Sequence, residues 1–266
     1  MIKIHVISDL DLGFNEFADP IDETLPDVDL VIINGNIGNI KRSALYASSL
    51  CQKYPDIQFV WNLGELERYW RVIGKFTDEI EENLKFRKAT NPTWPKNLHW
   101  CSDDRMFVKL RTGEVVDIFC TYGFPYIQQY EGLWEETHWY KHYATRVTYD
   151  VQEYSEKPKN TSNVGHGALP VWATKDWIND NHRRIENLVK KWEIEVTGFK
   201  ILVTHLNPFN DNRFKNQQVS PYRIHLSNML WVAAGSPTGN VNFLGAKLIS
   251  NPGRGAEARN KVTIVN

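Results

Sequence analysis

Several polar residues in this sequence are of types that bind metal ions, and each of them follows a short apolar stretch. They are Asp9, Asp11, Asn36, Glu65, His205 and, less obviously, Ser236 and Thr238. Carboxylate and amide oxygens together with an imidazole form the ligand set of a divalent metal site. Polar groups follow strands in any α/β protein, so one such residue is a weak signal. Their order along the chain is what predicts a shared metal site.

The apolar stretches before these residues have the pattern of strands that are buried in a parallel sheet. Residues 4–7, 29–33 and 57–61 are rich in Ile, Val and aromatic side chains, and polar residues follow each stretch. A long connection and a helix predicted over 41–54 separate them, which indicates right-handed parallel crossovers. Ligands bind beyond the carboxyl ends of such strands, so a single sheet could gather the candidate residues along one edge.

The second half of the chain adds strands of an antiparallel type, which indicates a mixed sheet. Residues 106–111 and 115–122 are predicted to form a hairpin around Gly113. Further strands are predicted at 98–101, 199–203, 230–233, 241–244, 247–250 and 262–265, and further helices from Thr77 and from Thr174 to about Val196.

Composition narrows the class of protein. The 266 residues suffice for one large domain with a full core. Lys and Arg (31) nearly cancel Asp and Glu (32), which gives no electrostatic reason to expect nucleic acid or a membrane surface as a partner. The three cysteines are far apart and outside any CxxC spacing, which is typical of reduced thiols. Without a signal-peptide pattern or an apolar run of membrane-spanning length, we expect a cytoplasmic protein.

Residues 123–150 form the least ordinary segment, because Phe, Tyr and Trp alternate there with Glu, His and Lys. Aromatic density of this kind could line a substrate cleft or a partner surface. The more common arrangement is an insert that packs its rings over the sheet.

Five stretches of the chain, taken in order, resemble the calcineurin-like metallophosphoesterases. The stretches are Asp9-Leu10-Asp11, Gly35-Asn36-Ile37-Gly38, Gly64-Glu65-Leu66-Glu67, Thr204-His205 and Gly235-Ser236-Pro237-Thr238. The corresponding blocks of that family are DxH, GDxx, GNH followed by Asp or Glu, a lone His after a strand, and GHxH. The resemblance runs from Ile4 to Gly253. It implies an α/β fold with a mixed β-sandwich flanked by helices, in a single domain over residues 1–266.

The resemblance also shows where this chain departs from the family. The family binds two metal ions, one of which the first block holds with Asp and His, while the Asp of GDxx bridges both. At two of the matching positions, Asp9 and His205, this sequence has the same residue type as the family's metal ligand. The other ligand positions now hold Asp11, Asn36, Glu65, Ser236 and Thr238, and the acid-supplying His of GNH is replaced by Leu66.

Each departure weakens the chemistry that the family performs. The neutral amide of Asn36 offsets the repulsion between two dications less well than a carboxylate, which disfavours a dinuclear centre. Ser236 and Thr238 are poor replacements for two imidazole ligands. Leu66 has no proton to give to a leaving group, and such a loss typically costs about a hundredfold or more in rate.

The remaining carboxylates still require a positive charge. Asp9, Asp11 and Glu65 brought together need a cation or raised pKa values. One hard ion such as Mg²⁺, Mn²⁺ or Ca²⁺, held by Asp9, Asp11, Asn36, Glu65 and His205, would satisfy them, and so would a Lys or Arg side chain. Asn62 lies near enough to Glu65 in the sequence to take over as a ligand if the loop between them differs.

Three functions are compatible with these residues. The first is a protein with little or no catalytic activity that binds a phosphate-containing small molecule or a protein partner. The second is an active phosphoesterase or nucleotide hydrolase with an oxygen-rich site for a single metal ion. The third is an interaction protein that uses the aromatic segment 123–150.

Overall fold

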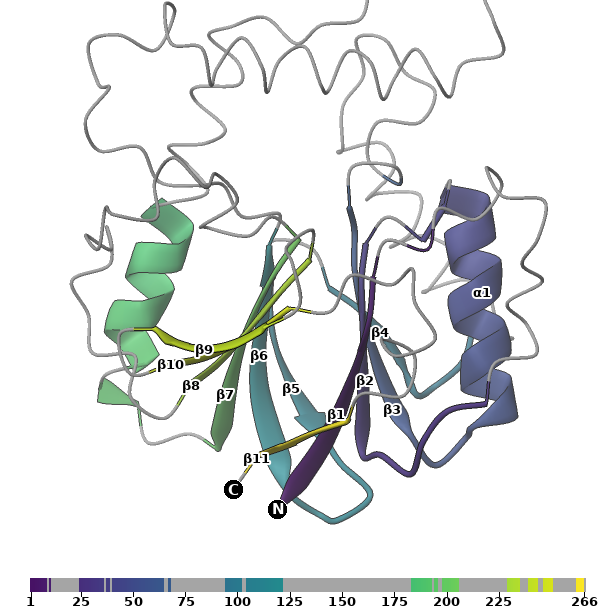
Figure 1. Ribbon diagram of the computed structural model, residues 1–266, viewed down its shortest axis with the longest axis horizontal. Coiled ribbons are helices and arrows are strands. Elements are labelled where there is room, and N and C mark those ends of the chain that lie inside the picture. Colours follow the sequence, from purple (N-terminus) through teal and green to yellow (C-terminus); the bar gives the residue numbers. More distant parts are fainter. Residues whose placement is uncertain are drawn as a thin grey trace, which may run out of the picture.

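In the computed structural model, two β-sheets pack face to face, and a helix covers the outer side of each (Figure 1). The described residues are 1–8, 10, 24–35, 37–38, 40–64, 67, 94–101, 104–121, 183–192, 194–195, 198–205, 229–234, 239–243, 246–250 and 262–265. Only the backbone is described for Lys41 and for the last three ranges. The expected α/β class with a mixed, helix-flanked sandwich is confirmed.

The first sheet has the strand order β11-β1-β2-β3-β4 within the described part of the chain. β1 (Ile2–Ile7), β2 (Leu30–Asn34), β3 (Gln58–Asn62) and β4 (Leu98–Trp100) run parallel, and β11 (Val262–Val265) pairs antiparallel with β1. β2 is buried along its whole length, as its uninterrupted apolar run predicts for a parallel strand that is covered on both faces.

The second sheet has the order β5-β6-β7-β8-β10-β9 over the same described ranges. Its strands are β5 (Asp104–Lys109), β6 (Val115–Thr121), β7 (Phe199–Thr204), β8 (Met229–Ala233), β9 (Gly239–Phe243) and β10 (Ala246–Ser250). β6, β7, β8 and β10 are parallel, while β5 and β9 pair antiparallel at the two ends. β5 begins two residues before the predicted strand, and it ends earlier because Leu110 already belongs to the turn that closes on Glu114 (2.8 Å, Leu110 N to Glu114 O).

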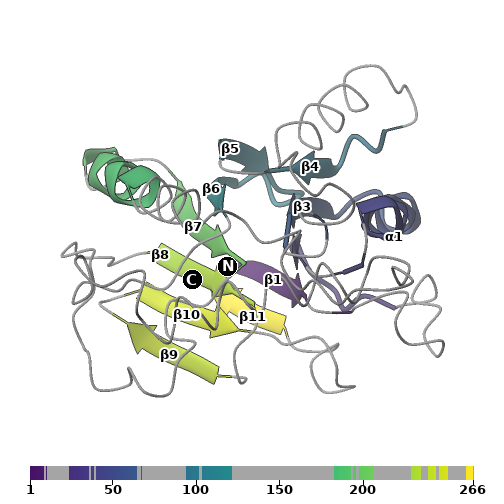
Figure 2. The ribbon, with the colours of Figure 1, turned by 90° about the horizontal axis from the view of Figure 1, so that it is seen from above.

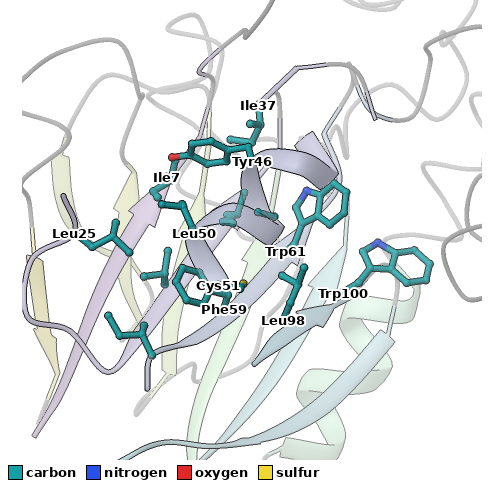
Figure 3. Packing of buried hydrophobic residues seen from close by; sticks show 14 of the residues in the cluster. Ile7, Leu25, Ile37, Tyr46, Leu50, Cys51, Phe59, Trp61, Leu98 and Trp100 are labelled. Atoms are coloured by element: carbon teal, nitrogen blue, oxygen red, sulfur yellow. The ribbon is translucent and has the colours of Figure 1, made fainter. Parts of the chain in front are cut away.

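Both outer faces are covered by amphipathic helices (Figure 2). α1 (Ile40–Lys53) packs on the first sheet through residues spaced three or four apart, as Figure 3 shows for Tyr46, Leu50 and Cys51. Helical residues 183–192 pack on the second sheet through Ile185, Leu188, Val189 and Trp192. No helix among the described residues is long and apolar enough to cross a membrane.

Inward-facing side chains of both sheets form the core between them. The core members are Ile2, Ile4, Val6, Leu30, Ile32, Val60, Cys101, Val108, Leu110, Val116, Ile118, Cys120, Ile201, Val203, Leu230 and Val232. All three cysteines are buried and none of them forms a disulfide. Burial raises the pKa of the Cys51 thiol, so this side chain stays protonated and unreactive.

The predicted helix from Thr77 and the aromatic segment 123–150 lie outside the described residues, as does the first part of the helix predicted from Thr174. The single-domain assignment over 1–266 therefore stays a prediction.

Ion pairs connect the two sheets near the beginnings of β1 and β2. The buried Asp29 carboxylate accepts hydrogen bonds from the backbone amide of Lys3 (2.9 Å) and from Arg111 Nε (2.9 Å). Asp27 is exposed and pairs with Lys3 and Arg111, and hydrogen bonds from Arg111 and then Lys3 lower the pKa of Asp27 to about 2. Because Arg111 lies in the turn after β5, these contacts join the second sheet to the first.

A buried ion pair holds the second helix against its sheet. The fully buried Asp117 carboxylate accepts hydrogen bonds from Arg105 Nε (2.9 Å), Arg105 Nη2 (2.7 Å) and Trp192 Nε1 (2.9 Å). Arg105 also pairs with Glu195, and Lys200 Nζ donates to the backbone carbonyls of Trp192 and Glu195. A cation beside the last carbonyls of a helix opposes the negative end of its dipole. These contacts fix the C-terminal end of the helix.

We predict that Asp117→Ala lowers the free energy of unfolding by about 3–5 kcal/mol, because it leaves the Arg105 guanidinium and the Trp192 indole without their buried acceptor. Urea denaturation at neutral pH measures this change. The matched control is Glu186→Gln, which breaks the exposed pair between Glu186 and Lys190 on the same helix and should change stability by less than about 0.5 kcal/mol. Equal effects of the two substitutions would contradict the assigned role of Asp117.

Candidate functional site

Most of the predicted ligands fall outside the described residues. Asp9, Asp11, Asn36 and Glu65 are among these, as are Leu66, Ser236 and Thr238. His205 is described and lies just beyond the end of β7, where it is buried. Within the described residues no group of three or more His, Cys, Asp or Glu side chains could hold a metal ion. Because four of the five predicted ligands are outside that search, the ligand set stays a prediction.

The expectation that one sheet gathers all the candidate residues is wrong. The stretches with Asp9, Asn36 and Glu65 follow strands of the first sheet, whereas His205 follows a strand of the second. The carboxyl ends of the two sheets nevertheless meet, because Asn34 at the end of β2 hydrogen-bonds to Thr204 at the end of β7. The apolar pattern tells which residues are buried and leaves open which sheet a strand joins, so it did not assign these strands to the two sheets of the expected sandwich.

Polar side chains close the core between the sheets at these carboxyl ends. Alternate residues of a strand face the same side. Ile32 and Val60 belong to the core between the sheets, so Asn34 and Asn62, two residues later, continue its face. Both asparagines are fully buried and are opposite each other in the register of β2 and β3. His205 follows the inward-facing residues of β7 in the same way.

Hydrogen bonds join these residues into a network that spans both sheets. Asn34 Nδ2 donates to the Thr204 carbonyl (2.8 Å). Asn62 Nδ2 donates to Asn34 Oδ1 (2.9 Å) and to the Thr121 carbonyl (3.1 Å). The backbone amide of His205 donates to that same Thr121 carbonyl (3.3 Å). The ends of β2 and β3 are thereby tied to the ends of β6 and β7, and we call these five residues the strand-end network.

The imidazole of His205 has a defined orientation within this network. Its Nδ1 lies 2.9 Å from the backbone carbonyl oxygen of Asn34. A carbonyl only accepts hydrogen bonds, so Nδ1 carries the hydrogen and the lone pair of the neutral ring is on Nε2. Metal-binding histidines are commonly held in this way, with the second ring nitrogen donating to a carbonyl or carboxylate.

A buried carboxylate joins the two loops that contain Asn36 and Glu65. Glu67 is fully buried, and its Oε1 accepts from the Ile37 amide (2.9 Å) and from Ser43 Oγ (2.9 Å). Its Oε2 accepts from the Gly64 amide (2.9 Å). α1 has no acidic residue in its own first turn, so Glu67 supplies the negative charge that the positive end of that helix favours. The two loops are therefore held at a fixed spacing.

Gly35 lets the loop after β2 approach both Gly64 and His205. Its φ is +74°, and a Cβ placed on it would lie 2.4 Å from Gly64 N and 2.7 Å from His205 Nδ1. A side chain here would collide with the backbone of the neighbouring loop and with the ring of His205. Glycine is required for its conformation and for space.

Sequence reasoning missed Asn34, Asn62 and Glu67 as organising residues, apart from naming Asn62 as a substitute ligand. A signal existed for the asparagines, because each interrupts an apolar strand at an inward-facing position. For Glu67 the signal was its match to the acidic residue that follows GNH, which does not tell that the side chain is buried or what it contacts.

No protein-family model and no curated protein matches this chain. Among solved structures, TT1561 of Thermus thermophilus is 15% identical, with 94% of this chain and 89% of that chain covered and a TM-score of 0.49. A second solved structure is 10% identical over 94% of this chain and 90% of its own, with a TM-score of 0.39. Likenesses this distant carry no argument about function, and the fold rests on the strand pairing described above.

We predict that Gly35→Ala destabilises the protein more than Gly113→Ala does. Both glycines have positive φ, +74° and +87°, which costs an alanine about 1–2 kcal/mol. Nothing lies within 4 Å of a Cβ on Gly113, whereas one on Gly35 would also collide with Gly64 and His205. The collision should add at least about 1–3 kcal/mol to the loss of unfolding free energy, measured by urea denaturation. Equal losses would mean that the approach of the two loops is looser than described.

We predict that Glu67→Gln lowers the free energy of unfolding by about 1–3 kcal/mol. The glutamine amide would place its own N–H group against one of the donors that now hydrogen-bond to the carboxylate, which are Ile37 N, Ser43 Oγ and Gly64 N. The control is Ser43→Ala, which removes a single donor and should cost about 0.5–1.5 kcal/mol. Thermal unfolding of both variants provides the comparison. A Glu67→Gln variant as stable as wild type would exclude Glu67 as the residue that joins the two loops.

Proposed function

We propose that this chain is a metallophosphoesterase-like protein with a degenerate centre. It holds one divalent cation and binds a phosphate-containing ligand, with little or no hydrolysis. The cation would be bound by Asp9, Asp11, Asn36, Glu65 and His205. The observation that supports this most directly is the orientation of His205, whose Nδ1 donates a hydrogen bond to the Asn34 carbonyl.

The described residues fit such a cation. His205 lies at the carboxyl ends of the strands, which is the region where α/β proteins bind ligands. Asn62, in the same network, has a buried side-chain oxygen without a hydrogen-bond partner among the described residues. The Glu67 carboxylate is occupied by three donors, so it organises the loops and is not counted as a ligand. A divalent ion bound here would polarise a phosphoryl oxygen.

The sequence argues against efficient hydrolysis at this place. Leu66 stands where the family has the histidine that protonates the leaving group, and a hydrocarbon side chain has no proton to transfer. Ser236 and Thr238 replace two imidazoles that would help to hold a second metal ion. Asn36 lacks the charge of a bridging carboxylate. Binding can survive these losses because a single ion requires only the carboxylates and His205.

The alternative is an active phosphoesterase that works with a single ion, and His205 would serve it equally well. The two functions differ only in turnover. They share the cation, the ligand class and the fold.

We predict that the purified chain hydrolyses bis-p-nitrophenyl phosphate with added Mn²⁺ no faster than its Asp9→Ala variant. The comparison with Asp9→Ala removes any contribution of contaminating phosphatases.

We also expect p-nitrophenyl phosphate with Mn²⁺ to raise the melting temperature of the wild-type chain and not that of His205→Ala. Robust turnover that depends on Asp9 would replace the binding function by the catalytic one, and absence of any Mn²⁺-dependent shift would reject the proposed centre altogether.

A further inference from the structure

The side-chain oxygen of Asn62 is the most unusual polar atom of the strand-end network. Asn62 is fully buried, and its Oδ1 has no hydrogen-bond partner in the described part of the chain. Buried amide oxygens are nearly always hydrogen-bonded, so one without a partner requires an explanation. A ligand that offers positive charge is one such explanation.

The orientation of the Asn62 amide is fixed by its partners. Its Nδ2 donates to Thr121 O (3.1 Å), and a backbone carbonyl is only an acceptor. A rotated amide would place two oxygens against each other, so the orientation follows from the chemistry of the partner. The second hydrogen of Nδ2 goes to Asn34 Oδ1 (2.9 Å). Both donors are used, and Oδ1 is held on the other arm of the amide.

Asn62 and His205 lie close to each other because they share hydrogen-bond partners. Asn62 Nδ2 and the backbone amide of His205 share the Thr121 carbonyl as acceptor. Asn34 contacts both side chains, through its Oδ1 for Asn62 and through its backbone carbonyl for His205. The Asn62 amide group and the His205 imidazole ring therefore both contact Asn34 at the carboxyl ends of the two sheets.

From this arrangement we infer that Asn62 Oδ1 is a further ligand of the single divalent cation, beside His205. The inference rests on the proposed function. Amide oxygens are common ligands of hard divalent ions, and a neutral oxygen adds a ligand without adding to the negative charge of Asp9, Asp11 and Glu65. Asn62 would thus have two roles, since its nitrogen orients the network and its oxygen binds the ion.

Mn²⁺ binding, measured by electron paramagnetic resonance of the free ion, tests this inference without any activity assay. The two informative variants are Asn62→Leu and Asn62→Asp, both of which lose the donors to Asn34 and Thr121. Only Asn62→Asp retains an oxygen ligand. If Asn62 binds the ion, Asn62→Leu should raise the dissociation constant for Mn²⁺ by about tenfold or more. The Asn62→Asp variant should bind Mn²⁺ at least as tightly as wild type.

A purely structural role gives the opposite order, because the carboxylate of Asn62→Asp would face the Thr121 carbonyl and Asn34 Oδ1 and disturb the network more than leucine does. Tighter Mn²⁺ binding by Asn62→Leu than by Asn62→Asp would therefore overturn the inference. Trp192→Phe serves as the control for lost stability. It removes the Nε1 donor to Asp117 (2.9 Å) on the outer face of the second sheet, away from the strand-end network, and it should leave Mn²⁺ binding within about twofold of wild type.

A crystal structure of the wild-type chain grown with Ca²⁺ keeps the inference testable if the Asn62 variants fail to fold. An anomalous peak about 2.3–2.6 Å from Asn62 Oδ1 would support it. An ion bound by His205 but distant from Asn62 Oδ1, with a water molecule on that oxygen, would reject the inference and leave the proposed function intact. No ion and no Mn²⁺ binding in the wild-type chain would reject both.

Discussion

The contact between the carboxyl ends of the two sheets depends on buried hydrogen bonds made by Asn34. Its side chain donates to the Thr204 carbonyl across the sandwich, accepts from Asn62 within its own sheet, and its backbone carbonyl receives the Nδ1 hydrogen of His205. A buried amide needs all of these partners, because a polar group taken out of water without them is costly. The apolar core between the sheets holds them together, but apolar contacts are not directional. The strand-end network therefore sets how the two sheets are positioned relative to each other.

At the opposite end of the sandwich, ion pairs connect the two sheets. Asp29 and Asp27 connect the beginnings of β1 and β2 to Arg111 in the turn after β5. The pair between the exposed Asp27 and Arg111 contributes little to stability. Asp29 is buried and accepts hydrogen bonds from Lys3 N and Arg111 Nε, so it is the acid that anchors this end.

Defined contacts support the candidate centre. Glu67 joins the two loops, Gly35 allows their close approach, and a carbonyl orients His205. The residues that would hold a second ion or supply a proton differ from those of the family that the sequence resembles. The proposed binding function needs the first group of residues and not the second.

The sequence by itself determined the elements and the order of the polar residues along the chain. Apolar runs predicted β1, β2, β3, β7 and β11 to within a residue or two, and a three-to-four-residue spacing predicted α1. These features depend on local periodicity, which any single segment contains. The replacement of a proton donor by Leu66 is equally a property of the sequence.

Only the tertiary structure decided which strands belong to each of the two sheets, that Glu67 turns inward, and which ring nitrogen of His205 donates to the Asn34 carbonyl. Each of these depends on partners far away in the chain, such as Asn34 and Thr204, which are separated by 170 residues. Periodicity encodes whether a side chain is buried and says nothing about which distant group it meets. The hydrogen-bond partners that define the site were therefore beyond the reach of the sequence.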